Sequence, residues 1–212
     1  MTKLQAFIIP VTPFQQNCSL VFDDARKLGA IVDPGGDVDQ IIEAIHESGI
    51  TIEKILLTHG HIDHAGGAAE LQEKLGVPIE GPHPEDLFLL EKLAESGAQY
   101  GMASRPVVPD RWLREGDSVT VGDLSFAVYE APGHTPGSVV FFNQENRFAL
   151  VGDVLFQGSI GRTDFPRGDH ATLLRSIREK LFPLGDDVVC LPGHGSPCRI
   201  GEERRTNPFL NA

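Results

Sequence analysis

The sequence predicts an α/β fold, and two observations lead to this prediction. Short apolar runs typical of buried strands alternate along the chain with stretches whose apolar residues recur at helical spacing. The 212 residues are 41% hydrophobic, which is enough to bury a sizeable core in one domain or at most two. We expect a single domain over residues 1–212, although the alternation by itself fits several α/β architectures.

In the first half of the chain, four apolar runs predict strands. They cover residues 6–9, 19–22, 30–32 and 55–57. Apolar residues at helical spacing predict three helices: Val38, Ile41, Ile42 and Ile45 in the first, Ala68, Leu71 and Leu75 in the second, and Leu87, Leu90, Leu93 and Ala94 on the buried face of a third helix over residues 84–94. Asp37 is the expected N-cap of the first helix.

The second half continues the alternation. Two predicted strands, residues 119–121 and 124–129, flank Gly122-Asp123, which is a hairpin signal. Further strands are expected at residues 139–142 and 148–151, and a last strand at 188–191. A fourth helix precedes that last strand and carries four apolar residues: Leu173, Leu174, Ile177 and Leu181.

Charge and cysteine content restrict the partners and the compartment. With 18 basic and 30 acidic residues the chain has a net charge of −12, and this lack of a broad basic surface argues against nucleic acid as a partner. The three cysteines, Cys18, Cys190 and Cys198, show no disulfide framework and are expected to be reduced thiols, with Cys190 buried in packing. No secretory signal or membrane-spanning run is evident, so we expect a cytoplasmic protein without a membrane partner.

The segment Thr58-His59-Gly60-His61-Ile62-Asp63-His64 concentrates three imidazoles and a carboxylate directly after a predicted strand. Neutral imidazole and carboxylate are the ligands that zinc and similar divalent metals take. A loop that leaves a strand can direct alternate side chains toward one point. The segment therefore predicts a metal site.

Three further candidate ligands also follow apolar runs. His134 lies in Pro132-Gly133-His134-Thr135-Pro136-Gly137, Asp153 follows Val151-Gly152, and His194 lies in Pro192-Gly193-His194-Gly195. The carboxyl ends of neighbouring strands in α/β proteins converge on one edge of the sheet, where ligands bind. Glycine and proline beside each candidate suit tight turns. The four segments can therefore meet at one site.

These four segments, in this order, resemble those of the metallo-β-lactamase superfamily, and specifically its small bacterial glyoxalase-II-like (hydroxyacylglutathione hydrolase-like) hydrolases. The resemblance also includes Pro10, Asn17-Cys18-Ser19, Val32-Asp33-Pro34-Gly35-Gly36 and Asn207-Pro208-Phe209. It implies a four-layer αββα sandwich with metals at one edge between two sheets. It further implies one metal on His59, His61 and His134, a second on Asp63, His64 and His194, and Asp153 bridging both.

The resemblance implies a dinuclear hydrolase of small thioesters, with S-lactoylglutathione or another hydroxyacylglutathione as substrate. A hydroxide generated between two divalent ions would attack the thioester carbonyl. Asp63 would both bind the second metal and accept a hydrogen bond from the hydroxide, which makes it the candidate catalytic residue. Zinc is the expected metal, and iron or manganese would accept the same ligands.

Two residues around this site have alternative interpretations. Asp33 either holds a ligand histidine in the required tautomer or is an ordinary turn residue. Arg162 either binds a glutathione carboxylate, as a cationic residue near this position does in glyoxalase II enzymes, or pairs structurally with Asp164 or Asp169. His46, His83 and His170 match no motif position. We expect His170 to begin a helix and the other two to be solvated.

Two other functions remain open from the sequence. Persulfide dioxygenases resemble this chain in the metal-binding residues and in Gly161-Arg162-Thr163-Asp164, but use a single iron. A non-catalytic metal-binding module is the third hypothesis. The sequence does not predict the oligomeric state.

Overall fold

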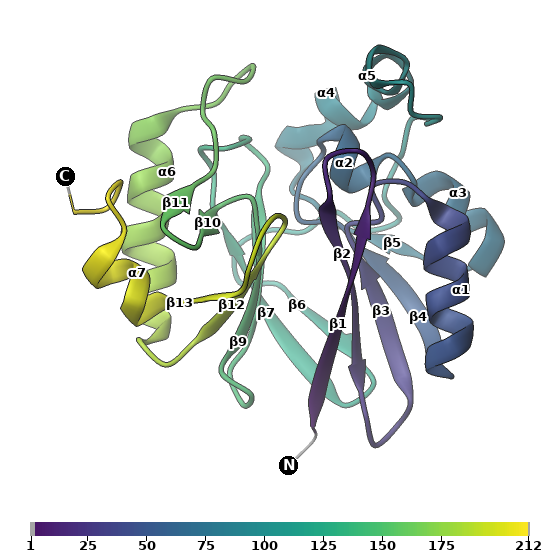
Figure 1. The fold of residues 1–212 in the computed structure, drawn as a ribbon, viewed down its shortest axis with the longest axis horizontal. Coiled ribbons are helices and arrows are strands. Elements are labelled where there is room, and N and C mark those ends of the chain that lie inside the picture. Colours follow the sequence, from purple (N-terminus) through teal and green to yellow (C-terminus); the bar gives the residue numbers. More distant parts are fainter. Residues whose placement is uncertain (1–2, 212) are drawn as a thin grey trace.

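The computed structural model describes residues 3–211, which form four layers (Figure 1). Two β-sheets face each other in the middle, and helices cover the outer side of each sheet. The strand order is β1-β2-β3-β4-β5 in the first sheet and β13-β12-β9-β8-β7-β6 in the second. The predicted αββα sandwich is confirmed.

The first sheet and its helices come from the first half of the chain. Its strands are β1 (Leu4–Val11), β2 (Gln16–Asp23), β3 (Leu28–Val32), β4 (Thr51–Leu56) and β5 (Ile79–Glu80). Strands β3, β4 and β5 are parallel, whereas β1 and β2 are antiparallel to their neighbours. The helices are α1 (Val38–Ser48), α2 (Ile62–Ala65), α3 (Ala68–Leu75), the 3₁₀ turn η1 (Pro84–Asp86), α4 (Leu87–Leu90) and α5 (Leu93–Tyr100).

The second sheet comes from the second half of the chain. Its strands are β6 (Ser118–Val121), β7 (Leu124–Glu130), β8 (Val139–Asn143), β9 (Phe148–Gly152), β12 (Val189–Pro192) and β13 (Cys198–Arg199). Strands β10 (Leu155–Phe156) and β11 (Ser159–Ile160) form a small separate ribbon. The outer helices are α6 (His170–Ser176), which continues through the π-helical turn η2 (Ile177–Leu181) and the 3₁₀ turn η3 (Phe182–Leu184), and α7 (Ile200–Thr206).

The buried side chains divide into three cores, one between each pair of layers. Along β9, Ala149 and Val151 face the core under α6 and α7, whereas Leu150 between them faces the core that joins the two sheets. Strand β3 behaves in the same way, with Ile31 toward the helices and Ala30 toward the other sheet. Because successive side chains point to opposite faces and both faces are covered, these strands appear as continuous apolar runs in the sequence.

Most predicted elements are present, with longer strands than expected. The hairpin at Gly122-Asp123 is confirmed, and α6 begins at His170 as predicted, capped by the Asp169 side chain. Asp37 occupies the N-cap position of α1, but its carboxylate does not cap the helix and instead accepts a hydrogen bond from the N–H of Thr12 at 2.7 Å.

The third predicted helix, over residues 84–94, was wrong in its length and in its buried face. The segment divides into η1, α4 and α5 and runs on to Tyr100, with a break after Leu90. Leu90 and Leu93 are buried as predicted, but Leu87 and Ala94 are exposed. Because the helix is interrupted after Leu90, residues that would lie on one face of a single ideal helix do not all face the core.

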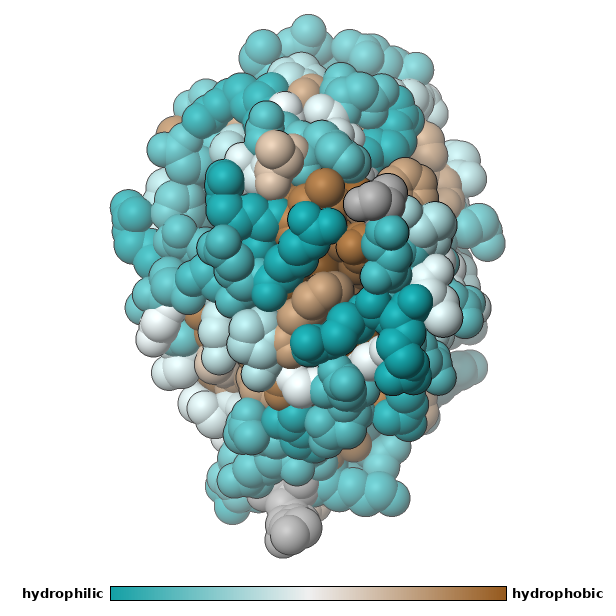
Figure 2. Space-filling view, turned by 90° about the vertical axis from the view of Figure 1, so that its left-hand side faces the viewer, coloured by the Kyte–Doolittle hydropathy of each residue, from teal (hydrophilic) through white to brown (hydrophobic). Residues whose placement is uncertain are grey.

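The outer face on the side of α6 and α7 is mainly hydrophilic, with apolar atoms visible in one hollow near its middle (Figure 2). Exposed residues of α7 include Glu202, Arg204 and Arg205. Within residues 3–211, no helix has the length and apolar character needed to cross a membrane.

Candidate metal centre

Each candidate ligand follows the carboxyl end of a strand. His59 and His61 follow β4, Asp153 follows β9 and His194 follows β12. His134 lies in the turn between β7 and β8, and Asp63 and His64 lie on the short helix α2. Since the two sheets face each other, loops from both reach a common edge, and the structure brings all seven residues together there.

The first group consists of His59, His61 and His134, whose ligand atoms all lie within 4.8 Å of one another. Nδ1 of His61 lies 3.1 Å from Nε2 of His59 and 2.9 Å from Nε2 of His134. His59 and His134 are buried, and His61 is partly exposed. Three imidazole nitrogens thus converge on one point.

The second group consists of Asp63, His64 and His194, whose ligand atoms also lie within 4.8 Å of one another. Oδ2 of Asp63 lies 3.1 Å from Nε2 of His194 and 3.8 Å from Nε2 of His64. His64 is fully buried, whereas His194 keeps 29% of its side chain exposed. This group is therefore open to solvent on the side of His194.

Asp153 lies between the two groups. Its Oδ1 is 3.3 Å from Nε2 of His64, and its Oδ2 is 3.6 Å from Nε2 of His134 and 3.7 Å from Nε2 of His194. One carboxylate therefore reaches members of both groups, as a bridging ligand must.

Hydrogen bonds around the centre decide which ring nitrogens carry protons. Nδ1 of His134 lies 2.7 Å from the carbonyl oxygen of Arg162 and must donate to it, since a carbonyl only accepts. Nδ1 of His64 likewise donates to the Asp33 carboxylate at 2.9 Å. In the neutral form of both rings Nε2 is therefore the atom with the free lone pair, and it points toward the centre.

Asp33 orients a second ring through Thr58. The Thr58 hydroxyl donates to Oδ2 of Asp33 at 2.6 Å, so its oxygen is left to accept the Nδ1 proton of His59 at 3.1 Å. The Thr58 N–H also donates to Oδ1 of Asp33. Asp33 is 3% exposed, and this network is the geometry expected of a carboxylate that supports metal ligands.

The two groups differ in their affinity for protons. Burial lowers the pKa of His59 and His134, and lowers that of His61 to about 3. Burial acts in the same direction on His64 and His194, but the nearby carboxylates outweigh it. Asp153 and Asp63 raise the pKa of His64, and the hydrogen bond to Asp63, together with the charge of Asp153, raises that of His194.

The donor set fits divalent metal ions. Within residues 3–211, Nε2 of His64 and Oδ1 of Asp153 are buried and lack hydrogen-bond partners, although burying such atoms unpaired is costly. Both atoms face the centre, where lone pairs from nitrogen and oxygen converge. A cation there would satisfy them, and nitrogen and carboxylate oxygen are suitable ligands for zinc, iron and manganese.

Asp86 is a buried residue near the centre that the sequence analysis did not identify. Its carboxylate accepts hydrogen bonds from the N–H groups of Gly60 and Gly137 and from the hydroxyl of Thr135. Desolvation raises the pKa of Asp86 to about 6 in spite of these three donors. Its partners are 26 to 51 positions away in sequence, so no local pattern indicates them.

The Arg162 side chain lies beside the first group, and its guanidinium is paired with Asp164. Nε and Nη2 of Arg162 donate to the two carboxylate oxygens at 3.0 and 2.7 Å, and both side chains are about two-thirds exposed. The guanidinium also stacks on Phe165 at 4.6 Å, and the Phe165 ring lies 4.8 Å from that of His61. Of the alternatives that the sequence leaves open for Arg162, the pairing with Asp164 is thus present, beside the first group.

The other histidines lie apart from both metal-binding groups. His46 is exposed on α1, and His170 begins α6. His83 was expected to be solvated, but only 12% of its side chain is exposed, because its Nδ1 accepts the N–H of Glu85 and its Nε2 contacts Arg114. The three cysteines are free and buried, in agreement with the predicted thiols.

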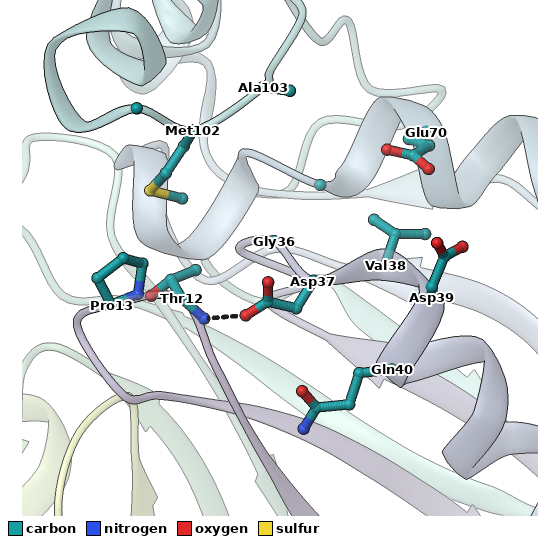
Figure 3. Close-up of a pocket in the computed structure, with 12 residues that line it drawn as sticks. Thr12, Pro13, Gly36, Asp37, Val38, Asp39, Gln40, Glu70, Met102 and Ala103 are labelled. Carbon is teal, nitrogen blue, oxygen red and sulfur yellow. Dashed lines mark hydrogen bonds between the residues drawn. The ribbon is translucent and has the colours of Figure 1, made fainter.

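A separate cavity of about 540 Å³ opens between the turn after β1 and the beginnings of α1 and α3 (Figure 3). Thr12, Asp37, Glu70 and Met102 are among the residues that line it, and the N–H of Thr12 donates to the Asp37 carboxylate. None of the seven candidate ligands lines this cavity. The chemistry of the ligand set, rather than cavity size, therefore identifies the candidate site.

Comparison with known proteins agrees with this fold. The family model of the metallo-beta-lactamase superfamily matches residues 11–194, and the chain belongs to this superfamily. It is 50% identical over 207 residues to the hydroxyacylglutathione hydrolase GloC of Haemophilus influenzae, with 97% of each chain covered.

Two solved structures are similar over nearly their whole length. The B3 metallo-beta-lactamase BLEG-1 has a TM-score of 0.90 and 37% identity, covering 98% of this chain and 100% of that one. TTHA1623 in a di-iron-bound form has a TM-score of 0.86 and 36% identity, covering 96% and 100%. These similarities confirm the metallo-beta-lactamase fold for this chain.

Proposed function

We propose that this chain is a dinuclear metal-dependent hydrolase of small thioesters, with a hydroxyacylglutathione such as S-lactoylglutathione as substrate. The main support is the convergence of seven ligand side chains in two groups that share Asp153. The similarity to the GloC hydrolase over 97% of both chains supports the substrate class.

Two divalent ions in these groups would lower the pKa of a water molecule between them and polarise the substrate carbonyl. His59, His61 and His134 would hold one ion, and Asp63, His64 and His194 the other, with Asp153 between them. Zinc is the proposed metal, and the di-iron form of TTHA1623 supports iron as an alternative.

Asp63 is the proposed catalytic residue. Burial raises its pKa, but the neighbouring His64 and the hydrogen bond from His194 outweigh this and keep the pKa below its ordinary value. Asp63 is therefore ionised at neutral pH and can accept a hydrogen bond from the attacking water, which orients that water toward the carbonyl. A thiolate is a stable leaving group, so the reaction needs no separate general acid.

Arg162 is the proposed contact for a substrate carboxylate. Its guanidinium is exposed at the mouth of the centre and is held in place by Asp164 and by Phe165. A substrate carboxylate must therefore compete with Asp164 for this cation. Buried, free thiols support the proposed cytoplasmic location, because reducing compartments maintain them.

Elemental analysis combined with an S-lactoylglutathione hydrolysis assay tests the proposal. We expect two metal ions per chain and thioester hydrolysis. His134→Ala should lose one ion, Asp153→Ala should weaken both, and each should lose activity, whereas the exposed control His170→Ala should retain both ions and full activity.

Unchanged metal content in His134→Ala and Asp153→Ala would show that the ligand assignment is wrong. A single iron per chain, together with oxygen-dependent turnover of a glutathione persulfide, would favour the dioxygenase hypothesis. Bound metal without turnover of thioesters, esters, lactams or persulfides would favour the non-catalytic module.

A further inference from the structure

The Asp86 carboxylate lies between the two loops that carry the first metal-binding group. Its Oδ2 accepts the Gly60 N–H at 2.9 Å and the Thr135 hydroxyl at 2.8 Å, and its Oδ1 accepts the Gly137 N–H at 2.7 Å. Gly60 separates His59 from His61, and Thr135 directly follows His134. A single side chain therefore connects both loops.

We propose that Asp86 is a positioning residue that sets the spacing between the His59–His61 loop and the His134 loop, and so tunes the affinity of the first group for its metal. The inference rests on the proposed metal centre. Asp86 is 0% exposed, so water does not compete for its three hydrogen bonds. Its hydrogen bonds to the two loops involve backbone N–H groups and one hydroxyl, and none involves an imidazole.

The two glycines permit this arrangement. A Cβ at position 137 would lie 2.6 Å from Oδ1 and Cγ of Asp86, and a Cβ at position 60 would lie 2.9 Å from Cβ of Leu89 and 3.2 Å from the backbone oxygen of Asp86. Glycine at position 137 lets the backbone approach the carboxylate closely, and glycine at position 60 lets it approach the backbone of Asp86 and the side chain of Leu89. The absence of a side chain at these two positions therefore leaves the space that Asp86 and its segment occupy.

Asp86 and Asp33 support the centre in different ways. Asp33 accepts the ring proton of His64 directly and that of His59 through Thr58, so it determines tautomers. Asp86 fixes backbone separation. Loss of Asp86 should therefore disturb the spacing of the first group and leave the second group, which belongs to α2 and to the loop after β12, largely unaffected.

Co²⁺ titration of the metal-free protein, followed by visible d–d absorption, tests this role without an activity measurement. Asp86→Asn keeps the size of the side chain but directs an amide N–H₂ at a backbone donor. We expect one of the two Co²⁺ equivalents to bind about tenfold to a hundredfold more weakly, with an altered absorption spectrum. That equivalent should be the one that His134→Ala abolishes.

Asp23→Asn is a matched control. Asp23 is also 0% exposed and accepts three backbone N–H groups, from Ala25, Arg26 and Asp123. It lies at the opposite end of β2 from Gln16, whose side chain approaches His64. We expect Asp23→Asn to lose stability in chemical denaturation, yet to bind both Co²⁺ equivalents as the wild type does.

Wild-type affinity and spectrum in Asp86→Asn would overturn the inference, as would an equal loss of metal affinity in Asp23→Asn. If Asp86→Asn does not fold, Thr135→Val removes one of the three donors without changing the side-chain volume much. It should weaken the same equivalent by a smaller factor, and wild-type binding would again overturn the inference. Failure of the wild type to bind two equivalents would instead count against the proposed dinuclear function.

Discussion

At the scale of single residues, the centre depends on where protons are held. Backbone and carboxylate acceptors take the Nδ1 protons of His134 and His64, so Nε2 is the ring atom that a metal would bind. The sequence motifs identify which residues converge, but they do not specify these tautomers. The acceptors, Arg162 and Asp33, lie 28 and 31 positions from the rings that they orient.

The different proton affinities of the two groups predict a pH dependence of metal content. Nearby carboxylates raise the pKa values of His64 and His194, so these two rings take up protons first as the pH falls. A metal that binds to the second group must then displace those protons. Each displaced proton lowers affinity by roughly tenfold per pH unit. Burial lowers the pKa values of the histidines in the first group, that of His61 to about 3, so these rings resist protonation.

We therefore expect the second equivalent of metal to dissociate first on acidification. Metal analysis after dialysis over a series of pH values measures the order of loss. Calorimetry in two buffers of different ionisation enthalpy should also show proton release for the second equivalent and little for the first. Loss of both equivalents at the same pH would contradict this assignment.

Substrate recognition by Arg162 should affect KM rather than kcat. The Arg162 backbone carbonyl holds His134 and is retained in Arg162→Ala, so metal content should not change. Since the guanidinium is exposed and already paired, we expect KM for S-lactoylglutathione to rise roughly two- to fivefold. Asp164→Asn should lower KM, because it removes the competing carboxylate.

A thioester without carboxylates provides the control for this prediction. Wild type, Arg162→Ala and Asp164→Asn should then have the same KM. An equal effect of Arg162→Ala on both substrates would indicate a structural role for the arginine.

At the scale of elements, the sequence predicts the buried strands well and the helices around the centre less well. Continuous apolar runs identify β3, β4, β8 and β9 because both faces of these strands are covered. Helix α2 has a single turn, and two of its four residues are candidate ligands, so it is too short to show apolar residues at helical spacing. Helix α7 has mainly charged residues, and its buried residues are Ile200, Gly201 and Glu203. Tertiary contacts, rather than apolar periodicity in the sequence, therefore determine where α2 and α7 form.

Helix α3 anchors the segment that follows the ligand-bearing α2. Leu71 is 0% exposed and belongs to the core between the first sheet and its helices. Leu71→Ala should lower the free energy of unfolding by about 2–5 kcal/mol through lost burial and the resulting cavity. Chemical denaturation measures this loss, and metal content per folded chain should stay at the wild-type value.

The exposed residue Glu73 on the same helix is the control. Glu73→Ala should leave stability nearly unchanged, because its contact with Arg105 is at the surface. A similar loss in both variants would mean that burial of Leu71 is not what distinguishes the two positions, because alanine is the better helix former at both.

At the scale of the whole molecule, the metal centre joins the two halves of the sandwich. Four candidate ligands come from the first half, and His134, Asp153 and His194 come from the second. Metal binding should therefore stabilise both halves together. At a free ion concentration of one hundred times the Kd, each ion contributes about 2.7 kcal/mol.

Removal of metal by a chelator should accordingly lower the melting temperature of the protein, and added Zn²⁺ should restore it. Differential scanning calorimetry measures both steps. His134→Ala and Asp153→Ala should respond less to the chelator than the wild type does. An unchanged melting temperature after verified metal removal would show that the ions do not connect the two halves.

The division of the ligands between the halves also has a consequence for synthesis of the protein. The chain segment with His59, His61, Asp63 and His64 leaves the ribosome well before β12, which lies inside the second sheet between β9 and β13. Domains generally fold as units. A nascent chain that ends before β7 thus carries two of the three ligands of each group, and both groups are complete only once the strand before His194 is inserted.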